Sequence, residues 1–254
     1  MFTGYVREIE DMLASGGFAS EVVCHGFDPA ASWPRQENQI VLAGQTAVEL
    51  GSPQMGSVAF TAWTQEPGLV HDGRICVVGP ELSTSHPMVP FGKVVLVQGH
   101  GFTDENAYAR FQELERIKYR LDLAGYMLHA VPQENKEWSR VSEDAMRRGL
   151  SLRVIGNEIL RDYKRVPYVD AVEVVLMASG SEDIERLRPI GDKVGRTLRA
   201  MNKMRERLEY DCANCGFSDV CSEVDGLRAM HRRQSVNKGI GSEKESLPRG
   251  KDEQ

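Results

Sequence analysis

The 254-residue sequence predicts an α+β (mixed α/β) fold, in which a mixed β-sheet is flanked by long helices and followed by a small C-terminal cysteine-rich metal-binding segment. Three observations support this prediction. Short runs rich in Val and Ile, each bounded by Gly, Pro or Asp, are typical of buried strands. Loops rather than helices separate these runs up to Thr103, which favours a mixed sheet over a doubly wound one. Elsewhere apolar residues recur every three or four positions, as they do in amphipathic helices.

The first elements follow from local spacing. An amphipathic helix is expected over residues 4–14, because Val6, Ile9 and Leu13 lie at near-helical spacing before a Ser-Gly-Gly break. A connector that contains two prolines follows over residues 25–38. The predicted strands are then the runs IVLAGQTAVEL, VAFTAWT, RICVVGP and KVVLVQG, with a later strand at VDAVEVVLMAS.

Three long patterns predict the main helices. The longest apolar stripe indicates a helix over residues 103–128, which Thr103 would cap ahead of two acidic residues in the first turn. A second helix is expected from Ser142 towards residue 159, where two glycines can interrupt it. The last helical pattern starts at Ser181, and Pro189 within it predicts a kink or a restart.

Changes in composition divide the chain into four parts. Residues 1–38 form an N-terminal helix and connector, and residues 39–209 form the α+β domain. Residues 210–233 form the cysteine-rich metal-binding segment. Residues 234–254 are polar and contain no aromatic side chains, so a flexible tail is expected there.

Charge and hydropathy exclude several classes of partner. A formal net charge of −6 and a pI near 5.6 argue against attraction of the whole surface to nucleic acid. No apolar stretch approaches the roughly eighteen residues that a membrane span needs, and the start MFTGYVREIEDML mixes charges into its apolar residues. A cytoplasmic protein with no nucleic-acid or membrane partner is therefore expected.

The cysteines are few and unevenly placed. Five is an odd number, which is not typical of a secreted disulfide framework, so metal ligation or redox chemistry is the better explanation. Cys212, Cys215 and Cys221 form a C-x2-C-x5-C pattern, whose tight turn can aim the sulfurs at one metal or cluster. We expect an iron-sulfur centre here, with structural zinc and free or redox-active thiols as the alternatives.

A fourth ligand for this site is not obvious. His231 is the first candidate, followed by Cys24 or Cys76, and then by solvent or a group from another subunit. Cys76 lies inside a predicted strand and is better explained as a small core residue. Cys24, next to His25, stays open.

From about Gln45 to Cys221, the chain resembles the acetyl-CoA synthase (beta) subunit of the carbon monoxide dehydrogenase/acetyl-CoA synthase complex. The order and spacing of several segments carry the resemblance. These segments are TAVELGSP, ICVVGPEL, KVVLVQGHGFTDENAYARFQELERI, WSRVSEDAMRRG and VDAVEVVLM, followed by a charged helix and a CxxC opening.

The resemblance implies a nickel-iron-sulfur centre that joins a methyl group from a corrinoid protein, carbon monoxide and coenzyme A into acetyl-CoA. The family's cluster cysteines would match Cys212 and Cys215, and Cys221 would match the third with a shortened gap. Family members also have a later Cys-Gly-Cys that holds nickel, which these residues do not contain. We therefore expect an acetyl-CoA synthase-like protein of a one-carbon system in an anaerobe, without independent acetyl-CoA synthesis.

The resemblance also implies cofactors and partners. The expected cofactor is a [4Fe-4S] cluster, or zinc in the alternative, and coenzyme A is a further candidate ligand. Arg196, Arg199 and Lys203 belong to a basic helical stripe, which is either a solvated surface or a contact for coenzyme A phosphates or an acidic partner. Expected partners are other subunits of a carbon monoxide dehydrogenase or corrinoid protein system, and a second copy of the chain. The competing hypothesis is a non-catalytic zinc or thiol module that docks into a larger complex.

Overall fold

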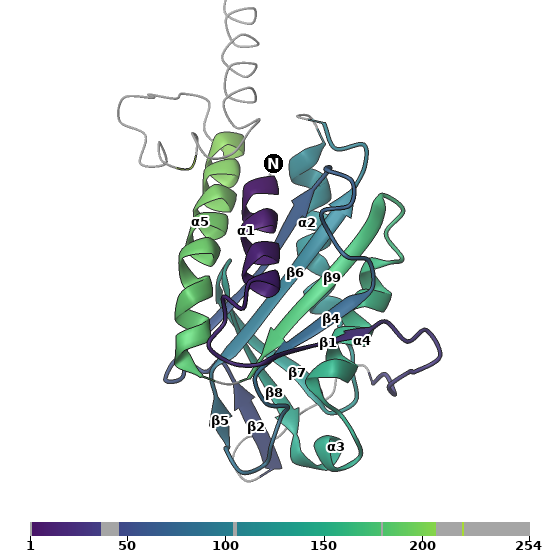
Figure 1. Cartoon of the computed structure of the whole chain (residues 1–254), viewed down its shortest axis with the longest axis vertical. Helices are drawn as coiled ribbons and strands as arrows, with labels where there is room; N and C mark the ends of the chain where they lie inside the picture. The colour runs from purple at the N-terminus through teal and green to yellow at the C-terminus, as the bar shows by residue number, and fades with distance from the viewer. Residues whose placement is uncertain (1, 37–45, 104–105, 179, 207–219, 221–254) are drawn as a thin grey trace, which may run out of the picture.

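The computed structural model describes residues 2–36, 46–103, 106–178, 180–206 and 220, without the side chains of residues 181 and 202–206. It confirms the predicted α+β class, with two mixed sheets and helices on both sides of the larger one (Figure 1). No described helix is long and apolar enough to cross a membrane.

The larger sheet has five strands in the order β1-β4-β9-β6-β3. Its strands are β1 (Val22–Gly26), β4 (Arg74–Val78), β9 (Val169–Met177), β6 (Phe91–Gly99) and β3 (Ser57–Thr64). Antiparallel and parallel pairs alternate across it, starting with the antiparallel β1/β4 pair at the edge. The central strands are buried on both faces, which explains why they are almost continuously apolar in sequence.

Helices cover both faces of this sheet. The helices α1 (Thr3–Ala14) and α5 (Ser181–Glu206) pack on one face and contact β3, while α4 (Leu152–Tyr163) packs against β4 and β9 on the other (Figure 1). Gly156 permits the close approach of α4, because a Cβ atom there would lie 2.6 Å from Cγ2 of Ile75. The helix α5 is one element that continues through Pro189, so of the two predicted outcomes the restart is wrong and the kink stays a prediction.

The smaller sheet has four strands in the order β5-β2-β8-β7. They are β5 (Met88–Val89), β2 (Ala47–Leu50), β8 (Lys136–Ser142) and β7 (Tyr126–Gln133). The two sheets are in contact through β3 and β8, and their buried side chains belong to one core. Only the second half of the predicted strand IVLAGQTAVEL lies among the described residues, as β2.

The predicted helix over residues 103–128 is the largest error. Among its described residues, it is a helix only over α2 (Ala107–Arg116) and a 3-10 turn, η2 (Ile117–Arg120), and the chain then enters β7. Gly125, at φ +91°, cannot continue a helix, and a Cβ atom there would lie 2.1 Å from that of Ala145. The apolar residues beyond η2 keep helical spacing by coincidence, since Leu121 and Ala124 lie in the segment between η2 and β7 and Leu128 lies on β7 itself.

The predicted second helix is divided in two. The side chain of Ser142 accepts a hydrogen bond from the backbone N–H of Ala145 and so caps α3 (Glu143–Arg147), as expected. The chain then turns at Gly149, at φ +108°, and Ser151 caps α4. Of the two glycines that could interrupt the helix, this one does so and Gly156 does not.

Candidate functional site

The predicted metal ligands lie outside the described residues. Cys212, Cys215, Cys221 and His231 all follow α5, whose last described residue is Glu206. The metal site therefore stays a prediction. What the structure describes is α5, which precedes these residues in the chain, and the surface around it.

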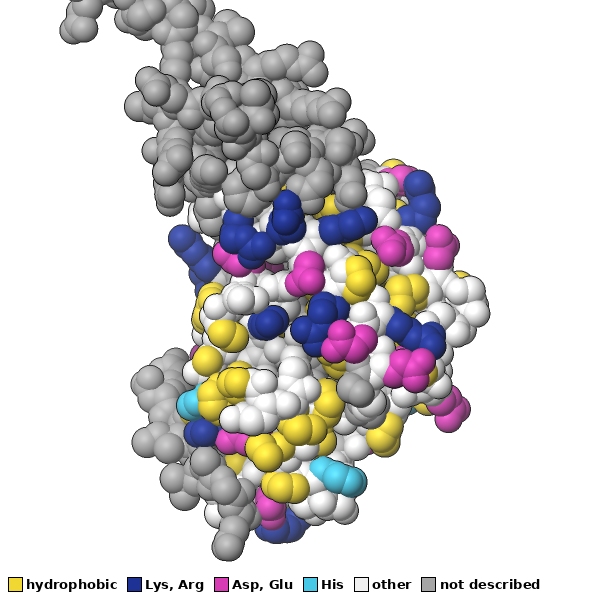
Figure 2. All heavy atoms as spheres, turned by 90° about the vertical axis from the view of Figure 1, so that its left-hand side faces the viewer, with side chains coloured by type: hydrophobic (Ala, Val, Ile, Leu, Met, Phe, Trp, Pro, Cys, Tyr) yellow, Lys and Arg dark blue, Asp and Glu magenta, His cyan; other side chains and the backbone are white. Residues whose placement is uncertain are grey.

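The residues predicted to contact coenzyme A lie on α5. Arg199 is exposed and forms an ion pair with Glu134, at 3.0 Å. Arg196 is half-buried and has an interaction partner of its own, while the side chain of Lys203 is outside the described part of the chain. Figure 2, which shows the side of the molecule on which α5 lies, has Lys and Arg side chains interspersed with Asp and Glu. This face is therefore not a uniformly basic stripe.

A surface hollow of about 370 Å³ lies beside the last described turns of α5. Its walls come from α2, η2, the turn between β7 and β8, and Leu198 of α5. Arg116 and Lys118 bring positive charge, whereas Glu115 and Glu134 bring negative charge. Lys118 pairs with Glu115 at 2.8 Å; burial alone would lower the pKa of Lys118, but this carboxylate raises it above its usual value. The hollow can bind an anionic group only in competition with its own carboxylates.

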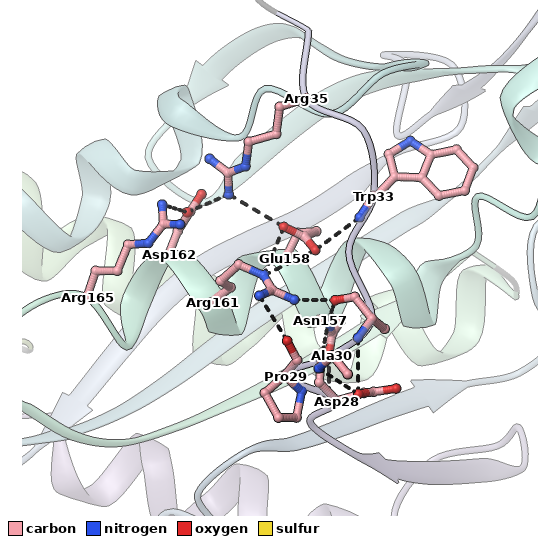
Figure 3. Close-up of polar contacts among 11 residues, drawn as sticks. Asp28, Pro29, Ala30, Trp33, Arg35, Asn157, Glu158, Arg161, Asp162 and Arg165 are labelled. Atoms are coloured by element: carbon pink, nitrogen blue, oxygen red, sulfur yellow. Dashed lines mark hydrogen bonds and ion pairs between the residues drawn. The ribbon is translucent and has the colours of Figure 1, made fainter.

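A second polar site holds the connector against α4 (Figure 3). Asn157 accepts a hydrogen bond from the backbone N–H of Asp28 at 2.8 Å, and its amide donates to the carbonyl oxygens of Asp28 and Ala31. Arg161 donates to the carbonyl oxygens of Pro29 and Ala31. These side chains satisfy backbone groups of a segment that has no regular secondary structure.

Charged groups add to these contacts (Figure 3). We call the whole arrangement, which joins residues 28–35 to Asn157, Glu158, Arg161 and Asp162 of α4, the connector clasp. Glu158 is only 2% exposed and accepts hydrogen bonds from the backbone N–H of Trp33, from Arg35 and from Arg161. Arg35 also pairs with Asp162 at 2.7 Å. The clasp contains no nucleophile, and its carboxylates are engaged: Glu158 and Asp162 have guanidinium partners, and Asp28 accepts from the backbone N–H groups of Ala30 and Ala31. It is therefore a device that positions the connector rather than a reactive centre.

A third polar cluster lies on the sheet face that α1 covers. Glu10, His71 and Glu173 place ligand atoms within 4.8 Å of one another, which is a grouping that could hold a metal ion. Arg74, however, donates to Glu173 at 2.6 Å and also pairs with Glu10. Its guanidinium already supplies the positive charge between the two carboxylates, so this is an ion-pair cluster and not a metal site.

The pKa values in this cluster follow from burial and charge. Burial raises the pKa of Glu173 to about 8, and the neighbouring Glu10 adds to the shift while Arg74 opposes it. Burial alone would lower the pKa of Arg74, but its two carboxylate partners raise it above its usual value. At neutral pH, Glu173 therefore holds a proton much of the time.

The two remaining cysteines lie next to this cluster. Cys76 is fully buried, as predicted for a core residue, but it forms a disulfide with Cys24, which the sequence analysis did not anticipate. In this state neither residue is the fourth metal ligand. The segment EVVCHG falls within residues 1–38, for which only a helix and a connector are predicted, yet its β-branched valines are a usable signal for β1, which brings Cys24 opposite Cys76.

Comparison with known proteins adds to this geometry. The family model for the CO dehydrogenase/acetyl-CoA synthase complex beta subunit matches residues 29–183, which run from the connector clasp to the start of α5. A curated relative, acetyl-CoA decarbonylase/synthase complex subunit beta 2 of Methanocaldococcus jannaschii, is 22% identical over 195 residues. The aligned part is 74% of this chain and 39% of the relative, so the chain spans about two fifths of the relative's length.

Proposed function

The chain belongs to the CO dehydrogenase/acetyl-CoA synthase complex beta subunit family, and from this membership we propose that it works as a metal-binding subunit of a complex of that kind. The extent of the family match is the observation that carries the proposal. The match covers the described α+β unit from residue 29 and ends at residue 183, within the helix that leads towards Cys212. The first of the three cysteines, Cys212, lies 29 positions beyond the end of the match, so the metal site itself is proposed from the spacing of the cysteines.

The proposed donor set is Cys212, Cys215 and Cys221, with His231, solvent or a partner group in the fourth position. Thiolates are the usual ligands of iron-sulfur clusters and of structural zinc, so the donor set fits either, and we propose a [4Fe-4S] cluster. Such a cluster supplies single-electron transfer or, at an iron with an open position, Lewis acidity. The proposal does not extend to acetyl-CoA synthesis by these 254 residues alone, because they contain no Cys-Gly-Cys for a nickel site.

The metal content under strict exclusion of oxygen tests this assignment. We expect a brown protein with broad absorbance near 400 nm and about four irons per chain, as this type of cluster gives. Cys215→Ser should lose most of the iron and the colour, because it removes one of three protein thiolates.

Cys24→Ser is the matched control, since it removes a cysteine that lies outside the donor set, and it should keep the metal. A colourless protein with one zinc per chain would contradict the iron-sulfur cluster and favour the alternative, a zinc module that docks into a larger complex. A metal content that stays the same in Cys215→Ser would contradict both versions of the site.

The proposed partners are other subunits of the complex, including a corrinoid protein. The relative's name describes a subunit of an acetyl-CoA decarbonylase/synthase complex, and family membership supports the extension to this chain. Coenzyme A is proposed as a ligand of the α5 face, because Arg199 forms an ion pair with Glu134, which lines the hollow together with Leu198. Its phosphates would have to replace Glu134 as the partner of Arg199.

A further inference from the structure

A disulfide crosses the edge of the larger sheet. Cys24 and Cys76 are direct partners in the antiparallel β1/β4 ladder, and β1 is an edge strand. The two sulfurs share the face that carries Arg74 and Glu173, because Arg74 and Cys76 are two positions apart on β4 and Arg74 pairs with Glu173 of β9. The disulfide therefore lies beside the ion-pair cluster described above.

The two cysteines differ in accessibility. Cys24 is an exposed residue, whereas Cys76 is completely buried. In thiol–disulfide exchange, a thiolate attacks one sulfur and the other leaves, so access decides which sulfur is attacked. An incoming thiolate can reach Cys24, and Cys76 must then be the leaving group.

A buried thiolate is a poor leaving group, because burial in apolar surroundings raises its pKa. Here a proton source lies close to it. Oε1 of Glu173 is 3.9 Å from Sγ of Cys76 and also accepts from Nε of Arg74. Burial and Glu10 raise the pKa of Glu173 to about 8, although Arg74 opposes the shift. On the solvent side of the cluster, Nδ1 of the exposed His71 lies 3.3 Å from Oε2 of Glu10, so the carboxyl groups can exchange protons with water.

We propose that Cys24 and Cys76 form a thiol–disulfide exchange site, in which a thiol reductant attacks Cys24 and the carboxyl group of Glu173 protonates the departing Cys76 sulfur. The first thiolate forms a mixed disulfide with Cys24, and Cys76 leaves with the electron pair and takes the proton. A second thiolate attacks the reductant's sulfur in the mixed disulfide and releases Cys24. In total, two reductant thiols become one disulfide, and the protein disulfide becomes two thiols.

The site lies at the margin of the shared family domain. Cys24 precedes residue 29, where the family match begins, whereas Cys76 and Glu173 lie within the match. Reduction removes the covalent link and leaves β1 held on β4 by backbone pairing over five residues and by the packing of Val22 against the core. An edge strand that links α1 to the connector clasp thus gains freedom when the bond is reduced.

The test measures reduction of the full-length chain by dithiothreitol, with alkylation and peptide mass spectrometry to follow each cysteine separately. We expect the rate to rise in proportion to the dithiothreitol concentration. With glutathione and a rapid acid quench, the mixed disulfide should be found on Cys24 and not on Cys76. Glu173→Gln, which keeps the size of the side chain but cannot donate the carboxyl proton, should slow the reaction at least about tenfold.

Glu49→Gln is the matched control, because Glu49 is a buried carboxylate in the other sheet, and it should react at the wild-type rate. Three results would overturn the proposal. The first is a rate that does not depend on the dithiothreitol concentration, which would indicate a structural disulfide that is reduced only after unfolding. The second is a glutathione adduct on Cys76, and the third is an equal reduction rate in the two Gln variants. If Glu173→Gln does not fold, the concentration dependence and the adduct position in the wild-type chain decide.

Discussion

The ion pair between Lys93 and Glu137 is the most consequential buried contact between the two sheets. Lys93 of β6 is 6% exposed and Glu137 of β8 is 1% exposed. Lys93 bonds to Oε2 of Glu137, while Tyr126 and Ser139 each donate to Oε1 at 3.0 Å. Burial alone would raise the pKa of Glu137, but Lys93 and these hydroxyls outweigh burial and lower it.

Replacing Lys93 by Met removes the cation that contacts Glu137 and leaves Oε2 of Glu137 without its bond from Lys93. Removing one partner of a buried ion pair costs about 3–5 kcal/mol of the free energy of unfolding. Without Lys93, burial raises the pKa of Glu137 in the folded state above its unfolded value. Stability of the variant should therefore fall, relative to wild type, as pH rises above the unfolded pKa, by up to about 1.4 kcal/mol per pH unit.

Urea unfolding followed by tryptophan fluorescence at pH 5.5 and pH 8 measures both effects. The double variant Lys93→Met/Glu137→Leu should regain most of the lost stability, because Tyr126 and Ser139 can still bond to each other at 2.9 Å. Arg7→Met serves as the control, since Arg7 pairs with Glu66 on the surface and its loss should cost no more than about 1 kcal/mol. The reasoning is refuted if Lys93→Met costs less than Arg7→Met, or costs the same at both pH values.

The remaining predictions concern the α5 face and the connector clasp. Arg199→Glu should weaken coenzyme A binding about tenfold or more, which is the loss expected for one charge-assisted phosphate contact. Calorimetry measures the affinity, with Arg188→Glu on the same helix as the control. Equal affinities in the two variants would contradict the proposed contact. Glu158→Gln should destabilise the fold by about 1–3 kcal/mol, because it weakens buried hydrogen bonds to charged groups. Arg165→Ala, at the exposed margin of the same clasp, should cost less than about 1 kcal/mol in the same urea assay. A larger loss of stability in Arg165→Ala than in Glu158→Gln would contradict the assignment of the clasp's stability to Glu158.

Much of the fold could be predicted where one element buries a regular stripe. The helix α1 was predicted nearly to its ends because its apolar residues repeat with the helical period, and the strands β3, β4, β6 and β9 because each is an almost continuously apolar run. The strand β7 was missed because it is only partly buried and an accidental helical spacing extended the preceding helix into it. The strand β8 was missed because two of its regularly alternating buried positions carry the polar Glu137 and Ser139, so the sequence shows no apolar alternation. Their identity depends on pairing with each other and with β2.

The sequence alone determined the α+β class, the family, and the spacing of Cys212, Cys215 and Cys221, because each of these depends on residues close together in the chain or on their order along it. The tertiary structure decided which distant residues meet. Cys24 and Cys76 are separated by 52 positions and Lys93 and Glu137 by 44, yet each pair is brought together by strand pairing or sheet contact. Local periodicity cannot encode such meetings, since they exist only once the chain has folded back on itself.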